Sequence, residues 1–389
     1  MSRKLRLVFL GMMGRCPFAG HSWGHMNWLI GFKRLGHEVY YVEDDTVWPY
    51  DPVQNTVTDD CRYAVNHIRQ CMERIGLRNR WAFRLANRHG ACWGMTPREL
   101  DGLYRSCDIL FNVPGATELR EEHLVAPFRV YVETDPVTAE LRFAQGDTRT
   151  QAVFSSHHAI VTYGENYGAP DCGVPLNGLT FFKTRQPVDL EFWRSAYNPE
   201  ARFFTTIGNY RQSGSDVEYR GEVYRWSKHH EWEKFLELPR RSAQQFELAV
   251  MLHDAGDREL LETHGWRLVS PFRMSLDVFG DYPEYIRRSR AEFTVAKDQN
   301  VRLRSGWFSD RDACYLACGK PVVVQDTGFS NILPVGEGLF AFSAMDEILD
   351  AIDAINSNYQ MHCKAARAIA EEYFKAEKVL AKLLADIGF

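Results

Sequence analysis

The segment from Arg302 to Phe342 constrains the fold more than any other part of the chain. It reads RLRSGWFSDRDACYLACGKPVVVQDTGFSNILPVGEGLFAF, and it divides into a helix, a strand and a turn. Ser309 has the position of an N-cap, residues 310–317 have an apolar face, and Gly319 marks the end of the helix. The apolar run 321–324 predicts a buried parallel strand. This order of elements predicts an α/β fold.

Polar and basic residues gather near the predicted strand ends of this half. Ligands of open α/β sheets bind at the carboxyl ends of the strands. Free N–H groups at a helix start and basic side chains suit the oxygens of a diphosphate. For each basic residue taken alone, the alternative interpretation is a solvated loop charge that binds no ligand. The candidate anion-binding residues are Asn209, Arg211, Lys297, Arg302, Ser309, Asp310, Arg311, Thr327, Gly328, Phe329 and Ser330.

The first half of the chain opens with a similar order of strand, glycine turn and helix. Residues 7–10 predict a strand, residues 23–35 an amphipathic helix, and residues 38–42 the next parallel strand. Gly11 and Gly14 lie in the turn, but the third glycine of a dinucleotide-binding fingerprint is misplaced. We therefore do not predict an NAD site here.

Histidine, carboxylate and amide side chains follow the predicted strands of the first half. An imidazole titrates near neutrality and can take a proton from a hydroxyl group, and a carboxylate at a strand end can do the same. A polar helix start and solvated acidic loops are the alternatives without a catalytic role. The candidate residues are His21, His25, Glu133, Asp135, Glu165 and Asn166.

The chain resembles bacterial nucleotide-sugar-dependent glycosyltransferases of the two-Rossmann-domain GT-B fold. Its second half carries Gly319-Lys320-Pro321-Val322-Val323 and Gln325-Asp326-Thr327-Gly328, similar to the strand and glycine loop of that group. Its first half carries Gly20-His21 and Gly36-His37-Glu38-Val39, similar to the opening of members that act on small molecules.

The resemblance implies two Rossmann-like domains with parallel sheets that face each other across a cleft. The anion-binding residues named above would hold the nucleotide-sugar donor. His21 would deprotonate the acceptor hydroxyl, held by Glu133 or Asp135 or replaced by one of them. His25, Glu165 and Asn166 would line the acceptor side of the cleft.

The resemblance leaves the ribose contact open. Many relatives carry two glutamates around the last glycine loop. In this chain Gln325 or Asp326 stands at the first place, and Glu337 is the candidate for the second. The choice between retention and inversion of the sugar configuration therefore stays open as well.

A length of 389 residues is enough for two α/β domains. Breaks at 183–199 predict a connector between them. We expect an acceptor domain at 1–190 and a donor domain at 191–375. The resemblance implies that a last helix at 376–389 crosses back to the first domain.

The composition excludes several classes of function. A net charge of −5 gives no reason to expect nucleic acid as a partner. Nine cysteines without a Cys-x-x-Cys pair predict reduced thiols, a cytoplasmic location and no zinc site. No apolar run is long enough to cross a bilayer, so we expect no integral membrane segment.

These observations predict transfer of a sugar from a nucleotide-diphosphate donor to a small-molecule or glycan acceptor, without a metal and without a further cofactor. Two alternatives stay open. One is a nucleotide-sugar epimerase or hydrolase on the same fold, and the other is a noncatalytic subunit that binds the nucleotide sugar. The identities of nucleotide, sugar and acceptor, and the oligomeric state, are not predicted.

Overall fold

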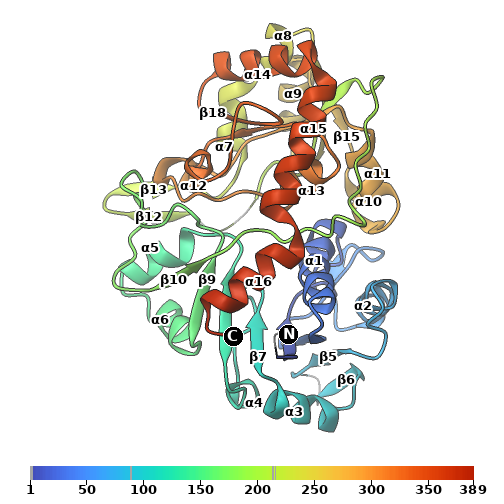
Figure 1. Cartoon of the computed structure of the whole chain (residues 1–389), viewed down its shortest axis with the longest axis vertical. Helices are drawn as coiled ribbons and strands as arrows, with labels where there is room; N and C mark the ends of the chain where they lie inside the picture. The colour runs from blue at the N-terminus through green and yellow to red at the C-terminus, as the bar shows by residue number, and fades with distance from the viewer. Residues whose placement is uncertain (1–2, 88–89, 213, 215) are drawn as a thin grey trace.

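The computed structural model describes residues 3–87, 90–212, 214 and 216–389, which form two parallel sheets with helices packed around them (Figure 1). A cavity lies between the two sheets, near the carboxyl ends of their strands. The sequence predicted this α/β arrangement.

The first sheet has the strand order β10-β9-β8-β7-β1-β2-β5-β6, and only the edge pair β5 and β6 is antiparallel. Leu7 and Phe9 of β1 pack into the largest core cluster, while Val8 and Leu10 point to the opposite face. Both faces are therefore apolar, as expected for a sheet covered on two sides. The strands are β1 (Arg6–Leu10), β2 (Glu38–Asp45), β5 (Trp81–Leu85), β6 (Ala91–Gly94), β7 (Ile109–Asn112), β8 (Arg129–Glu133), β9 (Ala159–Thr162) and β10 (Phe181–Lys183).

Helix α1 (Ala19–Arg34) begins four residues earlier than the sequence predicted. Glycines at 20, 24 and 31 weaken helix propensity, but eleven buried residues hold the helix against the core. A small hairpin of β3 (Tyr50–Asp51) and β4 (Thr56–Val57) follows β2. The other helices of this half are α2 (Arg62–Arg74), α3 (Pro97–Ser106), α4 (Glu121–Leu124), α5 (Thr138–Ala144) and α6 (Thr148–Ser155).

The second sheet is fully parallel, with the order β15-β14-β11-β16-β17-β18. This is the doubly wound order, in which the first strand in sequence lies at the centre and the chain runs outward in both directions. A separate hairpin joins β12 (Val217–Tyr219) to β13 (Glu222–Tyr224). The strands of the sheet are β11 (Phe203–Asn209), β14 (Gln245–Met251), β15 (Arg267–Val269), β16 (Ala291–Thr294), β17 (Val322–Gln325) and β18 (Leu339–Phe342).

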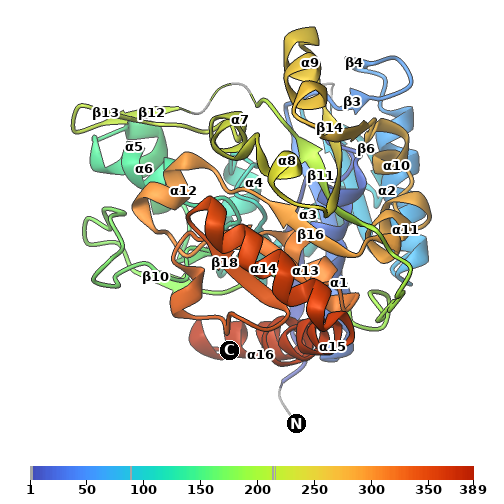
Figure 2. The same cartoon turned by 90° about the horizontal axis from the view of Figure 1, so that it is seen from above.

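The helices of the second half lie around this sheet, as Figure 2 shows from above. The segment after Ser227 is divided into short helical pieces. The structure has a short α7 (His229–Trp232), a 3-10 turn at Glu233–Phe235 and then α8 (Leu238–Arg241). The remaining helices are α9 (Ala255–Thr263), α10 (Phe272–Leu276), α11 (Asp281–Arg288), α12 (Asp298–Leu303), α13 (Asp310–Ala317), a 3-10 turn at Phe329–Asn331, α14 (Met345–Ser357) and α15 (Tyr359–Ile369).

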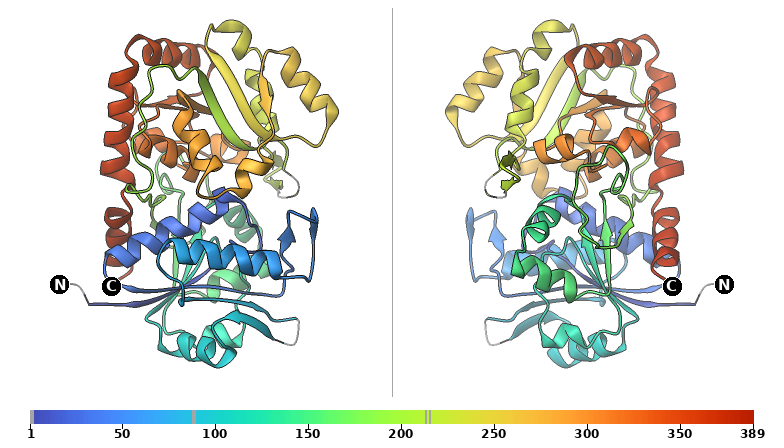
Figure 3. Two further views of the ribbon diagram at one scale, coloured as in Figure 1. Left: turned by 90° about the vertical axis from the view of Figure 1, so that its right-hand side faces the viewer. Right: turned by 90° about the vertical axis from the view of Figure 1, so that its left-hand side faces the viewer.

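Two segments cross side by side between the halves. A π-helical turn at Ala370–Phe374 leads from α15 into α16 (Ala376–Asp386). Val188 of the connector donates to the carbonyl of Phe374 at 2.7 Å and accepts from Ala376 at 3.0 Å. Helix α16 then packs on α1, which confirms the crossing back of the last helix (Figure 3). Among the described helices, none combines the length and apolar character that crossing a bilayer requires.

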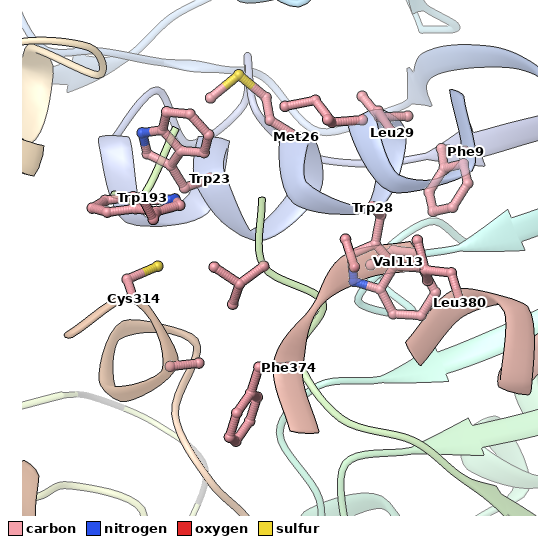
Figure 4. Packing of buried hydrophobic residues seen from close by; sticks show 14 of the residues in the cluster. Phe9, Trp23, Met26, Trp28, Leu29, Val113, Trp193, Cys314, Phe374 and Leu380 are labelled. Atoms are coloured by element: carbon pink, nitrogen blue, oxygen red, sulfur yellow. The ribbon is translucent and has the colours of Figure 1, made fainter. Parts of the chain in front are cut away.

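Helix α1 is the element around which both halves pack. Trp23 of α1 lies against Trp193 of the connector, with ring centres 5.1 Å apart, and Cys314 of α13 lies close to this pair (Figure 4). Farther along α1, Trp28 lies next to Leu380 of α16 (Figure 4). One continuous core therefore joins both sheets.

We expect Gly31→Ala to destabilise the protein. A Cβ at this position would lie 2.5 Å from Leu380 Cδ1 and 2.8 Å from Ala376 Cβ, so α16 would have to move. Overpacking of this kind costs about 1–3 kcal/mol. Gly24→Ala on the same helix is the matched control, because its Cβ would have nothing within 4 Å. Thermal unfolding should show a lower Tm for Gly31→Ala alone. An equal Tm for both variants would contradict the close packing of α16 on α1.

Candidate active site

A cavity of about 1060 Å³ lies between the carboxyl ends of the two sheets. Its wall in the first half comes from the start of α1, the loop after β7, the end of β8, and helices α5 and α6. Its wall in the second half comes from the end of β11, helix α10, and the segment leading into α13. The predicted residues that line it are His21, His25, Glu133, Asp135, Asn209, Ser309, Asp310 and Arg311.

The start of α13 forms part of the second wall. Ser309 caps the helix, as the sequence predicted, and its hydroxyl accepts a hydrogen bond from the Arg311 backbone at 3.2 Å. The N–H groups of a helix start and the positive end of its dipole favour an anion. Asp310 lies there too, and burial raises the pKa of its carboxyl to about 7. This acid can therefore be neutral when an anion approaches.

Arg311 lies at the cavity, but most of its donors are already used. Its guanidinium pairs with the buried Glu292 and donates to the Ile207 carbonyl at 2.9 Å. It also donates to Thr294 at 3.0 Å and to Asp312 at 3.2 Å. Arg311 thus ties α13 to the ends of β11 and β16. The main role of Arg311 is therefore to hold the second wall of the cavity in place.

Lys228 is a residue that the sequence reasoning missed. Its ammonium lies 5.2 Å from the centre of the Trp307 ring, and Trp307 lines the cavity. Within the described part of the chain, this ammonium has no hydrogen-bond or ion-pair partner. Burial, and then the charge of Arg311, lower the pKa of Lys228 to about 7. The sequence signal that could have indicated Lys228 is its position after the polar loop that follows Gly208-Asn209.

Lys297 and Asp135 form an ion pair that joins the two walls. Lys297 follows β16 and Asp135 follows β8, so each is at the strand end where the sequence placed it. Burial lowers the pKa of Lys297, and Asp135 opposes that shift. The ammonium also lies 3.0 Å from the centre of the Trp226 ring. Asp135 is therefore engaged by a cation of the other half and does not hold His21.

The two histidines of α1 differ in what their rings do. His25 uses both ring nitrogens on the backbone: Nδ1 bonds the carbonyl of His21 at 2.7 Å and Nε2 that of Val113 at 3.1 Å. This ring is buried and has a structural role. His21 lies at the cavity with its side chain exposed, and desolvation by the surrounding wall, then the neighbouring His25, lower its pKa. His21 is thus neutral at pH 7.

Glu133 faces the cavity from the end of β8 and contacts a second carboxyl group, that of Glu140 on α5. Glu133 is 3 % exposed and Glu140 is completely buried. Burial, and then the neighbouring Glu140, raise the pKa of Glu133 well above its usual range. Burial also raises the pKa of Glu140. The pair therefore binds a proton more tightly than an ordinary carboxyl group.

The sequence predicted that Arg211 and Arg302 bind the donor, but neither residue lines the cavity. Arg211 pairs with Asp257 of α9, with Nε 2.5 Å from the carboxylate. Arg302 pairs with Glu222 of the β12–β13 hairpin and donates to the Val223 carbonyl at 2.8 Å. Both guanidinium groups therefore have carboxylate partners away from the cavity lining, the buried Asp257 for Arg211 and the exposed Glu222 for Arg302.

The glycine loop after β17 and the loop after β9 also lie outside the lining. Asp326 accepts from the Gly328 backbone at 2.9 Å and from the Ser330 hydroxyl at 2.9 Å. Gly328 lies against Asn166, whose amide donates to the Arg304 carbonyl at 2.9 Å. These contacts join the two halves, and they use the polar groups that the sequence assigned to ligands.

The other residues of these loops have structural partners as well. Thr327 donates to the Trp307 carbonyl at 2.5 Å, and Phe329 packs on Phe308 with ring centres 5.2 Å apart. Glu165 accepts from Arg185 at 2.6 Å. Gln325 donates to Glu231 at 2.6 Å, so its side chain is not free for a ribose.

Across the described residues, no group of three or more His, Cys, Asp or Glu side chains is arranged to hold a metal ion.

No family model and no curated protein matches the sequence. Solved structures do match. An α-glucosyltransferase in complex with UDP and a 13-mer DNA has a TM-score of 0.58 and 11% identity over 100% of both chains. HepE from Anabaena, in complex with UDP-glucose, has a TM-score of 0.58 and 11% identity over 98% of this chain and 99% of its own. The chain has the GT-B fold.

A third GT-B structure is similar over the same length. Sucrose-phosphate synthase from Thermosynechococcus elongatus has a TM-score of 0.55 and 11% identity over 99% of each chain. At this level of identity the likeness shows the fold alone. It confirms the predicted GT-B arrangement of two parallel sheets, and the chemistry of this GT-B chain has to be argued from its own residues.

Proposed function

We propose that this chain is a glycosyltransferase that moves a sugar from a nucleoside-diphosphate donor to an acceptor hydroxyl group. The observation that carries the proposal is the capped start of α13 close to the unpaired lysine at 228, on one side of a large cavity. Two GT-B structures of similar shape are named as complexes with UDP or UDP-glucose, which supports a sugar nucleotide as the ligand.

The second half would hold the donor. The N–H groups at the start of α13 and the loop at Gly208 and Asn209 line the space for a diphosphate, and the Lys228 ammonium lies behind the Trp307 ring of the same wall. Positive groups there stabilise the charge that builds on the leaving diphosphate. We assign this role without a metal ion or a further cofactor, since a lysine and a helix start supply the positive charge.

The first half would hold the acceptor, with His21 and Glu133 next to the reacting hydroxyl. We propose 1–190 as the acceptor domain, 191–375 as the donor domain and 376–389 as the returning helix. We also propose a cytoplasmic location, which is supported by nine cysteines that are all unpaired thiols.

We expect Lys228→Gln to weaken binding of the nucleotide sugar by roughly 10- to 150-fold, the value of one charged hydrogen bond of about 1.5–3 kcal/mol. Arg302→Gln is the control, because its partner is Glu222 on the outer surface. Isothermal titration should show a change of less than about threefold for the control. Equal losses in both variants would exclude a specific role for Lys228.

Donor affinity should fall as the pH rises above about 7. A bound diphosphate favours the protonated Lys228 and the neutral Asp310, and both groups have a pKa of about 7 in the free protein. Binding therefore takes up protons above that pH and none below about 6. Titrations from pH 6 to 9 should show this slope in the wild type and a smaller slope in Lys228→Gln. An affinity independent of pH would contradict the assignment.

Turnover tests the function itself. The protein should release nucleoside diphosphate from one of a panel of UDP, GDP and dTDP sugars, and mass spectrometry should find the sugar on an added acceptor. Free sugar, or an epimer formed without acceptor, would favour a hydrolase or epimerase instead. Donor binding without modification of any acceptor would favour a noncatalytic subunit.

A further inference from the structure

Glu133 and Glu140 are two carboxyl groups in contact, one in front of the other. Glu133 lines the cavity, whereas Glu140 does not and is completely buried. In the described structure, Oε1 of Glu133 and Oε1 of Glu140 have no hydrogen-bond partner. Two neighbouring buried carboxyl groups are stable only if they share a proton, because two negative charges repel. A single proton shared by the two carboxyl groups would give both oxygens a partner.

The remaining oxygens of the pair are held in place. Thr162 donates to Glu133 Oε2 at 2.9 Å, and this oxygen keeps a second lone pair. Glu140 Oε2 accepts from the Val137 backbone at 2.9 Å. Val137 has a φ of 97°, an unfavourable conformation for a β-branched residue. The fold thus keeps Glu140 in one orientation behind Glu133.

Few other charges act on the pair. Asp135 on the same strand also raises the pKa of Glu133, but Lys297 neutralises it. The Tyr167 hydroxyl lies next to Glu140 and accepts from Val137 at 3.1 Å, and burial raises the pKa of Tyr167 well above its usual range. It is therefore neutral. Tyr131 and Thr162 are the remaining polar neighbours from β8 and β9.

We propose that Glu133 and Glu140 form a proton relay that accepts the proton of the acceptor hydroxyl. The proposal rests on the transfer reaction above and assigns its base. Glu133 takes the hydroxyl proton on Oε2 while its shared proton moves from Oε1 to Glu140. The acceptor oxygen forms its bond to the anomeric carbon, the bond from that carbon to the diphosphate breaks, and the diphosphate leaves with the electron pair. Both carboxyl groups end protonated, Glu133 on Oε2 and Glu140 with the proton they shared, and one proton returns to solvent after product release.

In this relay Glu133 is the catalytic residue and Glu140 is a positioning residue that sets its proton affinity. Burial raises the pKa of both glutamates, so the pair binds a proton more tightly than an ordinary carboxyl group, whereas the pKa of His21 is lowered. A lowered pKa makes His21 a weaker base than an ordinary imidazole. His21 then contacts the acceptor without taking its proton.

Glu140→Gln keeps the size of the side chain and a hydrogen-bond acceptor but cannot take a proton. Loss of general base catalysis costs roughly 100- to 10,000-fold, and we expect this loss in kcat with an unchanged KM for the donor. The apparent pKa in the pH dependence of kcat should also shift. His21→Ala should lose less than about tenfold, since it does not carry the proton. Full kcat in Glu140→Gln, or a loss with the wild-type apparent pKa, would overturn the relay.

Infrared spectroscopy tests the shared proton independently of turnover. At pH 7 the wild type should show a C=O band of a protonated carboxylic acid that is missing from the double variant Glu133→Gln/Glu140→Gln, so the difference between the two spectra isolates the band of this pair. Absence of the band in the wild type would overturn the proposal even if transfer occurs. Presence of the band in a protein that transfers no sugar would instead refute the proposed function, so the two failures are distinguishable. Unchanged Tm shifts with nucleoside diphosphate would show that the variants are folded.

Discussion

Arg311→Met should lower the free energy of unfolding by about 3–5 kcal/mol. The guanidinium group is the cation for Glu292 and Asp312, whose side chains are both completely buried. Without it, two buried carboxyl groups lose their ion-pair partner, and the Ile207 carbonyl loses its donor at 2.9 Å. The end of β11, where the diphosphate would bind, loses its support. Thermal unfolding and chemical denaturation measure the loss.

Two further variants make this result specific. Arg267→Met removes an ion pair to Glu247 on the same sheet, but this guanidinium is 60% exposed, so we expect a cost below about 1 kcal/mol. Arg311→Lys keeps the charge without the planar set of donors, and it should lie between wild type and Arg311→Met. If Arg311→Met and Arg267→Met have equal stability, the buried cluster does not hold the donor wall.

Asp44→Asn should also cost about 3–5 kcal/mol at pH 7. Asp44 is completely buried and accepts from Arg84 at 2.9 Å, from Tyr104 at 2.8 Å and from Arg120. His123 Nε2 lies 2.9 Å from the same carboxylate. An amide in this place cannot neutralise the two arginines, which link β5 and α4 to the end of β2. This cluster stabilises the first sheet on the face that lies away from the cavity.

The difference between Asp44→Asn and the wild type should depend on pH. Hydrogen bonds from His123 and Arg84 hold the pKa of the Asp44 carboxyl well below its usual range, although burial opposes them. A depressed pKa stabilises the fold fully above the unfolded value of about 3.9, and the effect is lost as the pH falls towards the folded value. Denaturation at pH 7 and pH 3.5 should show a smaller difference at the lower pH. Asp101→Asn, on the exposed side of Arg84, should change little at either pH. A difference that is constant with pH would contradict the role of the ionised Asp44.

The sequence predicted the features that depend on neighbouring residues. Ser309 is an N-cap because a serine before an apolar helix satisfies the first N–H groups locally, and Gly319 ends the same helix with a φ of 66°. The strands β1 and β17 were predicted because buried parallel strands are continuous apolar runs. The carboxylates of Glu133 and Asp135 lie at the cavity because strand ends meet at one edge of a sheet.

The sequence could not predict which cations are free. The partner of Arg211 lies 46 residues away and that of Arg302 lies 80 residues away, so both seemed available to a ligand. Lys228 was missed for the opposite reason, since its lack of a partner appears only in three dimensions. The contact of Glu133 with Glu140 depends on how α5 returns over β8, and no sequence spacing indicates it.

A crystal structure with the nucleoside diphosphate that raises the Tm most would test the central claim directly. We expect the diphosphate oxygens within hydrogen-bond distance of the backbone at the start of α13 and of the Lys228 ammonium, on the second wall of the cavity. A diphosphate bound instead at the loop 326–330, or at Arg302 on the outer surface, would contradict this account of the donor site.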